Sequence, residues 1–544
     1  MMGARSGAGA TGAQWLLAIA CAVTPMLASG AAADPAPAPA ASGAAESNPT
    51  FDIWEFRVLG STVLQQRQIE QAVYPFLGSG KTLAEVQKAR DALAEVYRQG
   101  GYGAVSVDIP EQAVDDGIVR LAVTEGRIDR VEVKGAQYFS GREIRNALPS
   151  IEKGAVPNLN AFQSELVDLA QRSADRSITP TLRAGRAPGL VDVTLNVKDE
   201  APVHGNIEVN DRATADTSRT RISATLSYDY LFGRPQSLSV QYQTAPQSPQ
   251  EVKAWAFSWI DRLGGDDSWV AYLVDSKSDV AALGTVSVLG NGTVAGLRRN
   301  FSVLPGDTAS LVANLGVDYK SFKENIFVTP TDESRTPISY AVFSAGSGGY
   351  AQSGAWRLDG NGTLSWGMRG LGNREEDFAF KRYQAHASFA YVRGQFRLAR
   401  TLPFGTSAAL RISGQYSPTP VISNEQFSLG GVDTVRGYLE AESLSDSGVA
   451  GSFELGSPRW TIGAGGQHAF ALSTLAFFDA GIGTIENPLP GQARSMDLRS
   501  YGAGLLLSGP MHMDARLDWA RALVPGSRTA EHDSRLHFMF RVGF

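Results

Sequence analysis

The alternation of apolar and polar residues changes near residue 200 and divides the chain into two regions. Beyond this point apolar residues recur at every second position, as in Ile222, Ala224, Leu226 and Tyr228. Such alternation predicts β-strands with one apolar and one polar face, which is typical of a membrane barrel. A soluble β-sandwich also alternates, but its inner strands would place fewer charges on one face. We place sixteen strands at 203–213, 220–230, 236–245, 250–261, 267–276, 292–303, 308–320, 337–350, 354–367, 384–400, 405–416, 447–457, 473–483, 497–508, 511–522 and 535–544.

The connections between these strands alternate in length. Short periplasmic turns and longer outer loops are the asymmetry expected of a bacterial barrel. The connection 458–472 departs from this rule, because it is long and falls on the periplasmic side. The short set includes 232–235 and 402–404, and the long set includes 277–291, 321–336 and 417–446.

Residues 51–200 combine helical periodicity with short strands. In the strongest helix, 83–99, apolar residues such as Val86 and Leu93 recur at helical spacing. The order strand, helix, helix, strand, strand occurs twice, in 51–126 and in 127–200, which indicates an internal repeat of two small α+β domains. Neither unit carries a glycine-rich phosphate loop or a cluster of histidines and carboxylates.

The N-terminus predicts a secretory signal peptide in residues 1–33. Arg5 precedes an apolar run, 15–23, which is too short to span a bilayer as a helix, and small residues follow. An Ala/Pro-rich linker, 34–50, comes next and has no amphipathic face. Because Cys21 is the only cysteine, cleavage would leave no disulfide and no cysteine nucleophile.

Composition narrows the function. The net charge is −6 and no run of Lys or Arg stands out, so nothing points to nucleic acid. No later stretch reaches the roughly 20 apolar residues of a membrane helix, so a membrane-spanning chain must close its strands into a barrel. We expect no cofactor, no metal and no enzymatic activity. An outer-membrane hydrolase is one alternative function. The scattered histidines disfavour it, because none lies in a motif with a serine nucleophile.

Arg436 is the most informative polar residue of the barrel region. It lies in the stretch Val435-Arg436-Gly437-Tyr438, within the connection 417–446, which the strand count makes the sixth outer loop. An arginine in a narrow lumen loses hydration and needs a carboxylate, and its planar guanidinium suits a bidentate partner. Gly437 would let the backbone turn tightly beside it.

A second short signal, Phe477, Asp479 and Gly481, lies on the thirteenth predicted strand. We expect Asp479 to pair with Arg436 inside the barrel. The alternative is that Arg436 is a solvated loop residue and Asp479 merely lines the lumen. Because desolvation offsets much of the Coulomb gain of a buried pair, its expected role is to fix one conformation of the loop.

The last predicted strand places aromatic residues on one face. Phe538, Phe540 and Phe544 share this face with Leu536 and Val542. This pattern resembles the outer-membrane targeting signal that the barrel-assembly machinery reads. A soluble edge strand is the alternative, but it would leave a hydrophobic edge open to aggregation.

These features together resemble one known family. The repeated α+β unit is similar to the POTRA domain, and the motifs at 435–438 and 477–481 resemble those of the BamA-type barrel superfamily. With two POTRA-like units, the whole mature chain is similar to TpsB two-partner secretion transporters of the FhaC/ShlB/HecB (hemolysin activation/secretion) type. The resemblance implies a barrel in the outer membrane of a Gram-negative bacterium, POTRA domains in the periplasm, and an inward-folded loop at 417–446.

The resemblance also implies partners and a mechanism. A large secreted TpsA exoprotein, hemolysin- or adhesin-like, would dock on the POTRA domains and pass through the barrel lumen. Outer-membrane lipid and, during biogenesis, the barrel-assembly machinery would be further partners of a monomeric protein with porin activity. Some family members have an N-terminal plug helix, which the linker at 34–50 does not favour. The alternative function is a factor that inserts other barrels, although such proteins usually carry more than two POTRA domains.

Overall fold

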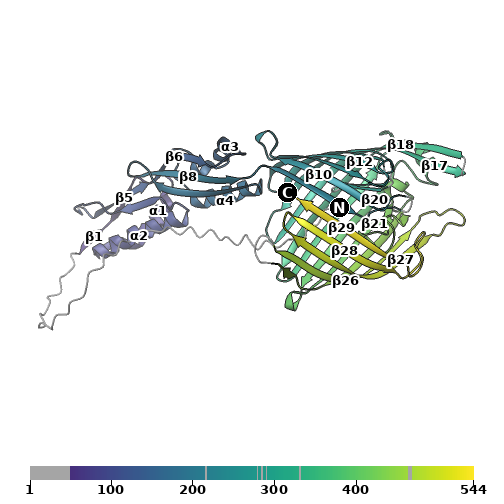
Figure 1. Ribbon diagram of the computed structural model, residues 1–544. Helices are drawn as coiled ribbons and strands as arrows, with labels where there is room; N and C mark the ends of the chain where they lie inside the picture. Colours follow the sequence, from purple (N-terminus) through teal and green to yellow (C-terminus); the bar gives the residue numbers. More distant parts are fainter. Residues whose placement is uncertain are drawn as a thin grey trace, which may run out of the picture. The chain divides into compact units, whose positions relative to one another are not determined.

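The computed structural model describes residues 50–544 except 115, 215–216, 278–279, 284–285, 290, 330–331 and 464–468. The predicted signal peptide and nearly all of the predicted linker therefore lie outside the described residues. The described chain divides into two compact units. One is formed by Ala201–Phe544 and the other by nearly all of the residues before it (Figure 1).

The first small domain is a three-stranded sheet covered by two helices. Strand β2 runs parallel to the central strand β5, and β4 pairs with β5 in the antiparallel sense. Helix α2 begins after Thr82, whose side chain and that of Glu85 form a capping box. Its face with Val86, Leu93 and Tyr97 is buried against the sheet. The elements are β1 (Phe51–Ile53), β2 (Glu55–Leu59), α1 (Gln66–Val73), η1 (Tyr74–Phe76), β3 (Gly78–Lys81), α2 (Leu83–Gln99), β4 (Val105–Asp108) and β5 (Ile118–Glu125).

The second small domain repeats this arrangement. Its sheet has the order β6-β8-β7, in which β6 is parallel and β7 antiparallel to the central strand. Asn158 accepts a hydrogen bond from the backbone of Ala161 at 3.0 Å and so caps the start of α4. The elements are β6 (Arg127–Lys134), α3 (Gly141–Asn146), η2 (Pro149–Ile151), α4 (Leu159–Gln171), β7 (Arg176–Ala184) and β8 (Leu190–Asp199).

The larger unit is a closed antiparallel barrel of sixteen strands, counted among the described residues, and β29 pairs with β9 to complete the ring. Short β25 (Trp460–Ile462) continues along β26 beyond the end of β24. The sixteen strands are β9 (Val203–Asn210), β10 (Arg221–Asp229), β11 (Gln236–Thr244), β12 (Lys253–Gly264), β13 (Asp267–Lys277), β16 (Gly292–Leu304), β17 (Ala309–Thr329), β18 (Asp332–Ser353), β19 (Trp356–Gly367), β20 (Ala390–Thr401), β21 (Ser407–Tyr416), β24 (Ser447–Gly456), β26 (Phe470–Thr484), β27 (Ser495–Gly509), β28 (Met513–Ala522) and β29 (Ser534–Gly543).

Each of the sixteen predicted strands has a counterpart, but several connections differ from expectation. The predicted loop 321–336 is largely strand, because β17 and β18 remain paired into it. The loop 277–291 contains the short hairpin β14 (Val280–Leu283) and β15 (Val286–Leu289). The stretch 458–472, which we expected on the periplasmic side, is shortened by β25 and by the early start of β26. Pairing with a neighbouring strand satisfies the backbone groups of the paired residues in these segments, and it requires no alternation in the sequence.

The strand faces separate by polarity, as the alternation predicted. Outward residues such as Leu226, Phe257 and Leu505 keep 44–50% of their surface exposed on the barrel wall. Inward residues are polar or buried, as with Asp318, which accepts hydrogen bonds from Arg298 and Tyr272. An apolar outside and a polar inside are what lipid and water require. None of the described helices has the length and apolarity needed to cross a membrane.

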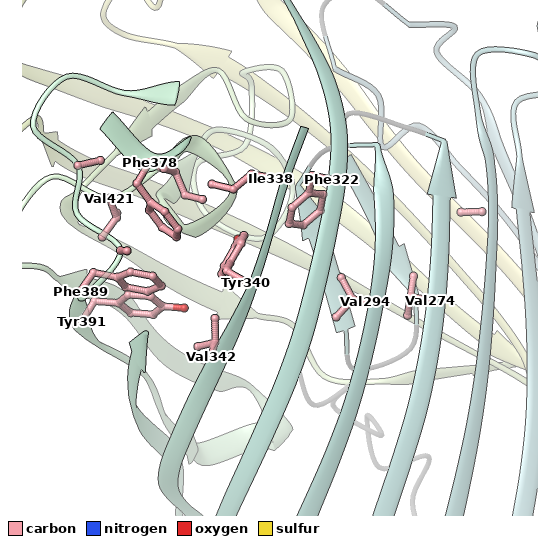
Figure 2. Close-up of a cluster of buried hydrophobic side chains, with 14 residues drawn as sticks. Val274, Val294, Phe322, Ile338, Tyr340, Val342, Phe378, Phe389, Tyr391 and Val421 are labelled. Atoms are coloured by element: carbon pink, nitrogen blue, oxygen red, sulfur yellow. The ribbon is translucent and has the colours of Figure 1, made fainter. Parts of the chain in front are cut away.

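One inner wall of the barrel carries an apolar cluster instead. Val294, Phe322 and Tyr340 project from neighbouring strands into one cluster with Phe378 of helix α5 (Glu375–Lys381) and Val421, and the ring of Tyr340 packs against that of Phe378 (Figure 2). Helix α5 belongs to the connection 368–389, where the sequence predicted that a strand starts at 384; the strand β20 starts at Ala390. The burial of Phe378 shows that this connection folds into the barrel.

Glu125 links strand β5 of the first small domain to the segment that leads into its first helix. Its buried carboxylate accepts hydrogen bonds from the backbone of Thr62 at 2.6 Å and of Val63 at 3.0 Å. Burial disfavours the charged form, but these bonds, the Thr62 hydroxyl and the charge of Arg127 outweigh it and lower the pKa of Glu125. The carboxylate therefore stabilises the folded domain above its unfolded pKa of about 4.3.

We predict that Glu125→Gln lowers the free energy of unfolding of the fragment 50–200 by about 2 kcal/mol at pH 7, because charge-assisted hydrogen bonds are lost. Urea unfolding followed by circular dichroism measures this. The difference from wild type should shrink as pH falls below about 4.3 and through the folded pKa. Glu95→Gln, on the exposed face of α2, is the matched control with little effect. Equal stability of Glu125→Gln and wild type at pH 7 would contradict the prediction.

Candidate functional site

The candidate site is built around Arg436, which is fully buried inside the barrel. Its guanidinium donates from Nε to Asp479 Oδ2 at 2.7 Å and from Nη2 to Asp479 Oδ1 at 2.8 Å. The backbone N–H of Arg436 donates to the same carboxylate at 3.1 Å. The structure thus places the two motif residues in a bidentate contact, the strongest geometry that this pair of side chains can adopt.

Further acceptors complete the arginine site. Nη1 donates to Glu454 Oε1 at 2.8 Å and to Asp518 Oδ2 at 3.3 Å, and Nη2 donates to Ser452 Oγ at 2.9 Å. The guanidinium also lies over the ring of Phe477, 3.4 Å from its centroid. These groups come from strands β24, β26 and β28, so one loop side chain connects three parts of the wall. Each nitrogen of the guanidinium therefore has an acceptor on the wall, and these contacts offset its loss of hydration.

Small residues let the loop approach the wall. A Cβ on Gly481 would lie 2.8 Å from Leu429 Cδ2 and 3.1 Å from Val435 Cγ2, which is too close for an unshifted side chain. Gly483 has the same role, because its Cβ would lie 1.9 Å from Ser445 Oγ. The motif contained Gly481, whereas Gly483 carried no signal in the sequence beyond its place on the same face of the strand.

The other residues of the loop motif are also seated in the wall. Val435 and Tyr438 are fully buried in an apolar cluster that includes Leu498. The Tyr438 hydroxyl lies within hydrogen-bond distance of the backbone carbonyls of Arg499 and Val524, at 2.8 and 2.7 Å. Gly437 has φ of +93°, and its N–H donates to His537 Nε2 at 3.0 Å. A residue with a side chain would be strained at this φ.

Sequence reasoning missed several partners of the loop. Glu454 and Asp518 share Arg436 with Asp479, and Arg516 contacts both of them at 3.4 and 2.8 Å. Asp433, beside the motif, pairs with Arg212. In the sequence, a lumen-facing carboxylate looks like any other polar residue that lines a water-filled barrel. Only the register of the strands shows that these carboxylates lie next to Arg436.

The aromatic residues of the last strand lie on the outer face. Phe540 and Phe544 are exposed, Phe544 at 70%, and Phe538 is half-buried. Phe544 extends the pairing of β29, since its N–H donates to Gly205 O at 2.9 Å. Its ring lies over Gly205, where a Cβ would come within 2.6 Å of it. Taken separately, neither unit brings three or more described His, Cys, Asp or Glu side chains together in a metal-binding group.

A closed sixteen-stranded barrel with an outer loop seated in its lumen, preceded by small α+β domains, is the architecture of the POTRA-barrel proteins of the outer membrane. A profile of the haemolysin secretion/activation proteins ShlB/FhaC/HecB matches residues 189–507, and a POTRA domain profile of the ShlB type matches residues 51–126. The chain belongs to the ShlB/FhaC/HecB family. It is an outer-membrane protein whose POTRA domains are periplasmic.

Individual relatives agree with this assignment. The outer membrane transporter CdiB of Escherichia coli O6:K15:H31 is 24% identical over 438 residues, 76% of this chain and 70% of that protein. The heme/hemopexin transporter protein HuxB of Haemophilus influenzae is 21% identical over 461 residues, 80% and 76% of the two chains. The structure of CdiB from Escherichia coli is similar with a TM-score of 0.60, 18% identity and 93% coverage of both chains. BamA from Haemophilus ducreyi, lacking POTRA domains 1–3, has a TM-score of 0.54 at 14% identity, with 91% and 100% coverage.

We predict that Arg436→Ala costs the folded barrel about 3–5 kcal/mol, because it leaves buried carboxylates without their cation. The double variant Arg436→Ala/Asp479→Asn should be less destabilised than the single variant, because it also removes the orphaned charge. The temperature at which the detergent-solubilised barrel loses its compact form on gels measures both. Arg397→Ala is the matched control, since this inward arginine on β20 makes none of these contacts. A double variant no more stable than the single one would show that the two side chains are not coupled.

Proposed function

We propose that the protein exports one large secreted partner, a TpsA-type exoprotein of the hemolysin or adhesin class, by two-partner secretion. The observation that carries this proposal is the loop motif held inside the lumen of a barrel that follows POTRA domains. The barrel supplies a polar path through lipid, and a loop held by polar bonds can occupy that path and be displaced. Family membership and relatives that are named transporters support the same function.

Recognition of the partner would take place on the POTRA domains, which we assign to 51–126 and 127–200. Strand β7 is an edge of its sheet and has nine residues, so its outer side can accept an extended segment except at Pro180, which has no N–H to donate. Adding a strand to an exposed edge uses main-chain hydrogen bonds and needs little sequence specificity. An unfolded partner arriving in the periplasm offers such a segment.

Passage through the barrel would then need no nucleotide. The inward strand faces offer hydrogen-bonding groups and water to an extended chain. Folding of the partner outside would give the movement its direction, because the folded product cannot return. We propose that the protein acts as a monomer, without catalysis, in contact with outer-membrane lipid, and that Phe538, Phe540 and Phe544 are read by the barrel-assembly machinery.

A factor that inserts other barrels into the membrane is the second candidate. The similarity of the fold to BamA favours it. The two functions differ in what is lost when the gene is deleted. An exporter affects one secreted protein, whereas an insertion factor changes the amounts of many barrels.

We predict that Arg436→Ala lowers the secretion of the partner by about tenfold or more, because the loop loses its buried attachment to the wall. A candidate partner, sought among the genes that neighbour this one, is co-expressed, and its amount in the medium is compared with the amount of barrel in outer-membrane fractions. Arg397→Ala again serves as the control and should secrete normally. Normal secretion by Arg436→Ala would refute the role of the motif.

We also predict that removal of residues 51–199 leaves a barrel that conducts ions in planar bilayers but secretes no partner. The two compact units of the chain make this separation possible. Conductance shows that the shortened protein is folded, and the amount of partner in the medium reports recognition. Continued secretion by the shortened protein would contradict the docking role of the POTRA domains.

A further inference from the structure

The connection 417–446, called loop 6 below, is attached to the barrel at a second place that the motifs do not include. Glu425 lies near the start of the loop and is 1% exposed. Its carboxylate accepts hydrogen bonds from Lys320 Nζ at 2.6 Å, from the Tyr391 hydroxyl at 2.7 Å and from the Tyr340 hydroxyl. Three donors and full burial make this a built site for the carboxylate rather than a chance surface contact.

The two attachments lie on different walls and have opposite charges. The donors to Glu425 come from β17, β18 and β20, whereas the acceptors of Arg436 come from β24, β26 and β28. Loop 6 thus presents an anion to a wall that carries Lys320 and a cation to a wall that carries three carboxylates. This arrangement fixes the orientation of the loop as well as its depth, because turning it round would place like charges together.

Glu425 belongs to a part of the loop that we call the stem, residues 421–429 and 442–446. The short strands β22 (Phe427–Leu429) and β23 (Ser443–Ser445) pair within it. At its base Asp446 accepts from the backbone of Val421 at 2.9 Å and from that of Glu486 in the next outer loop at 2.8 Å, and it pairs with Arg382. Val421 also lies in the apolar cluster beside Phe378 (Figure 2).

Residues 430–441, between the two parts of the stem, form a tip that carries Arg436. The stem and the tip meet at Gly430 and Gly431, both in the left-handed region with φ of +97° and +95°. A Cβ on Gly430 would lie 2.5 Å from Leu439 O, and one on Gly431 would lie 2.3 Å from the carboxyl carbon of Glu440. Two consecutive glycines give the backbone the freedom that hinges need.

Movement of either part would leave charges behind. If the tip moved away, Asp479 would lose Arg436 and Arg212 would lose Asp433, while Arg516 would still contact Glu454 and Asp518. If the stem moved away, Lys320 would lose Glu425 and Arg382 would lose Asp446. Because both movements uncover charge, the glycines between the two parts decide which part can move alone, and they allow the tip to move while the stem stays bound.

We propose that Glu425 is a positioning residue that keeps the stem of loop 6 on the barrel wall, and that displacement of the loop during export is confined to the tip, which turns about Gly430 and Gly431. This inference rests on the proposed export function. It separates a permanent attachment at Glu425 from a releasable one at Arg436, so that the loop returns to the same place after each partner has passed.

The test uses single cysteines in a Cys21→Ser background, which contains no other cysteine. Ser428→Cys reports on the stem and Thr434→Cys on the tip; both native residues are half-buried. Glu376→Cys, at an exposed position of helix α5, is the control that is always labelled. A membrane-impermeant maleimide is added to cells with and without the partner.

We expect the partner to raise the labelling rate of the Thr434→Cys variant several-fold and to leave that of the Ser428→Cys variant unchanged. Faster labelling of Ser428→Cys during export would overturn the proposal, because the stem would then move with the tip. Unchanged labelling of Thr434→Cys while the partner is being secreted would overturn it as well.

A second arm does not depend on export. Adding Glu425→Ala to the Ser428→Cys variant should make its thiol reactive in cells that lack the partner. The charge-exchanged pair Lys320→Glu/Glu425→Lys should restore protection of the same thiol. A thiol that stays unreactive with Glu425→Ala, or that stays reactive in the exchanged pair, would overturn the role of Glu425 as a charged anchor. Because this arm needs no secretion, a failed anchor is distinguished from a failed export function, which would appear as no secreted partner from the wild-type protein.

Discussion

The buried guanidinium of Arg436 is the contact on which the arrangement of the barrel interior depends. A charge removed from water is tolerated only when its donors find acceptors, and here three carboxylates, a hydroxyl and an aromatic ring supply them. These groups are brought together by strand register across β24, β26 and β28. The site therefore requires a closed, correctly registered barrel, and the loop can be seated only after the wall has formed.

The same constraint explains several residues that have no charge. Gly481 and Gly483 leave space on β26 for the loop, and Gly437 adopts a backbone conformation that other residues avoid. Val435 and Tyr438 then bury apolar surface against the wall. The polar contacts fix the place at which the loop binds the wall, and the small residues let the loop approach the wall closely. Glu125 in the first small domain also shows that a buried charge needs hydrogen-bond partners, because its carboxylate accepts hydrogen bonds from backbone N–H groups.

Much of the fold followed from periodicity, because a strand between lipid and water must alternate and a helix on a small sheet must bury one face. The contact of Arg436 with Asp479 followed from the need of a buried arginine for a carboxylate. Glu454, Asp518 and Glu425 could not be found in this way, since their roles depend on which strands become neighbours across the lumen. The paired extension of β17 and β18 was missed because backbone pairing needs no side-chain pattern.

Closure between β9 and β29 has a consequence for the order of folding. These two strands are neighbours in space but are separated by nearly the whole barrel sequence, so their pairing is the contact with the highest loop-closure entropy. Until it forms, the sheet has two open edges that can pair with other chains. We therefore expect ring closure to come after the formation of the individual hairpins, and the two open edges to need protection until then.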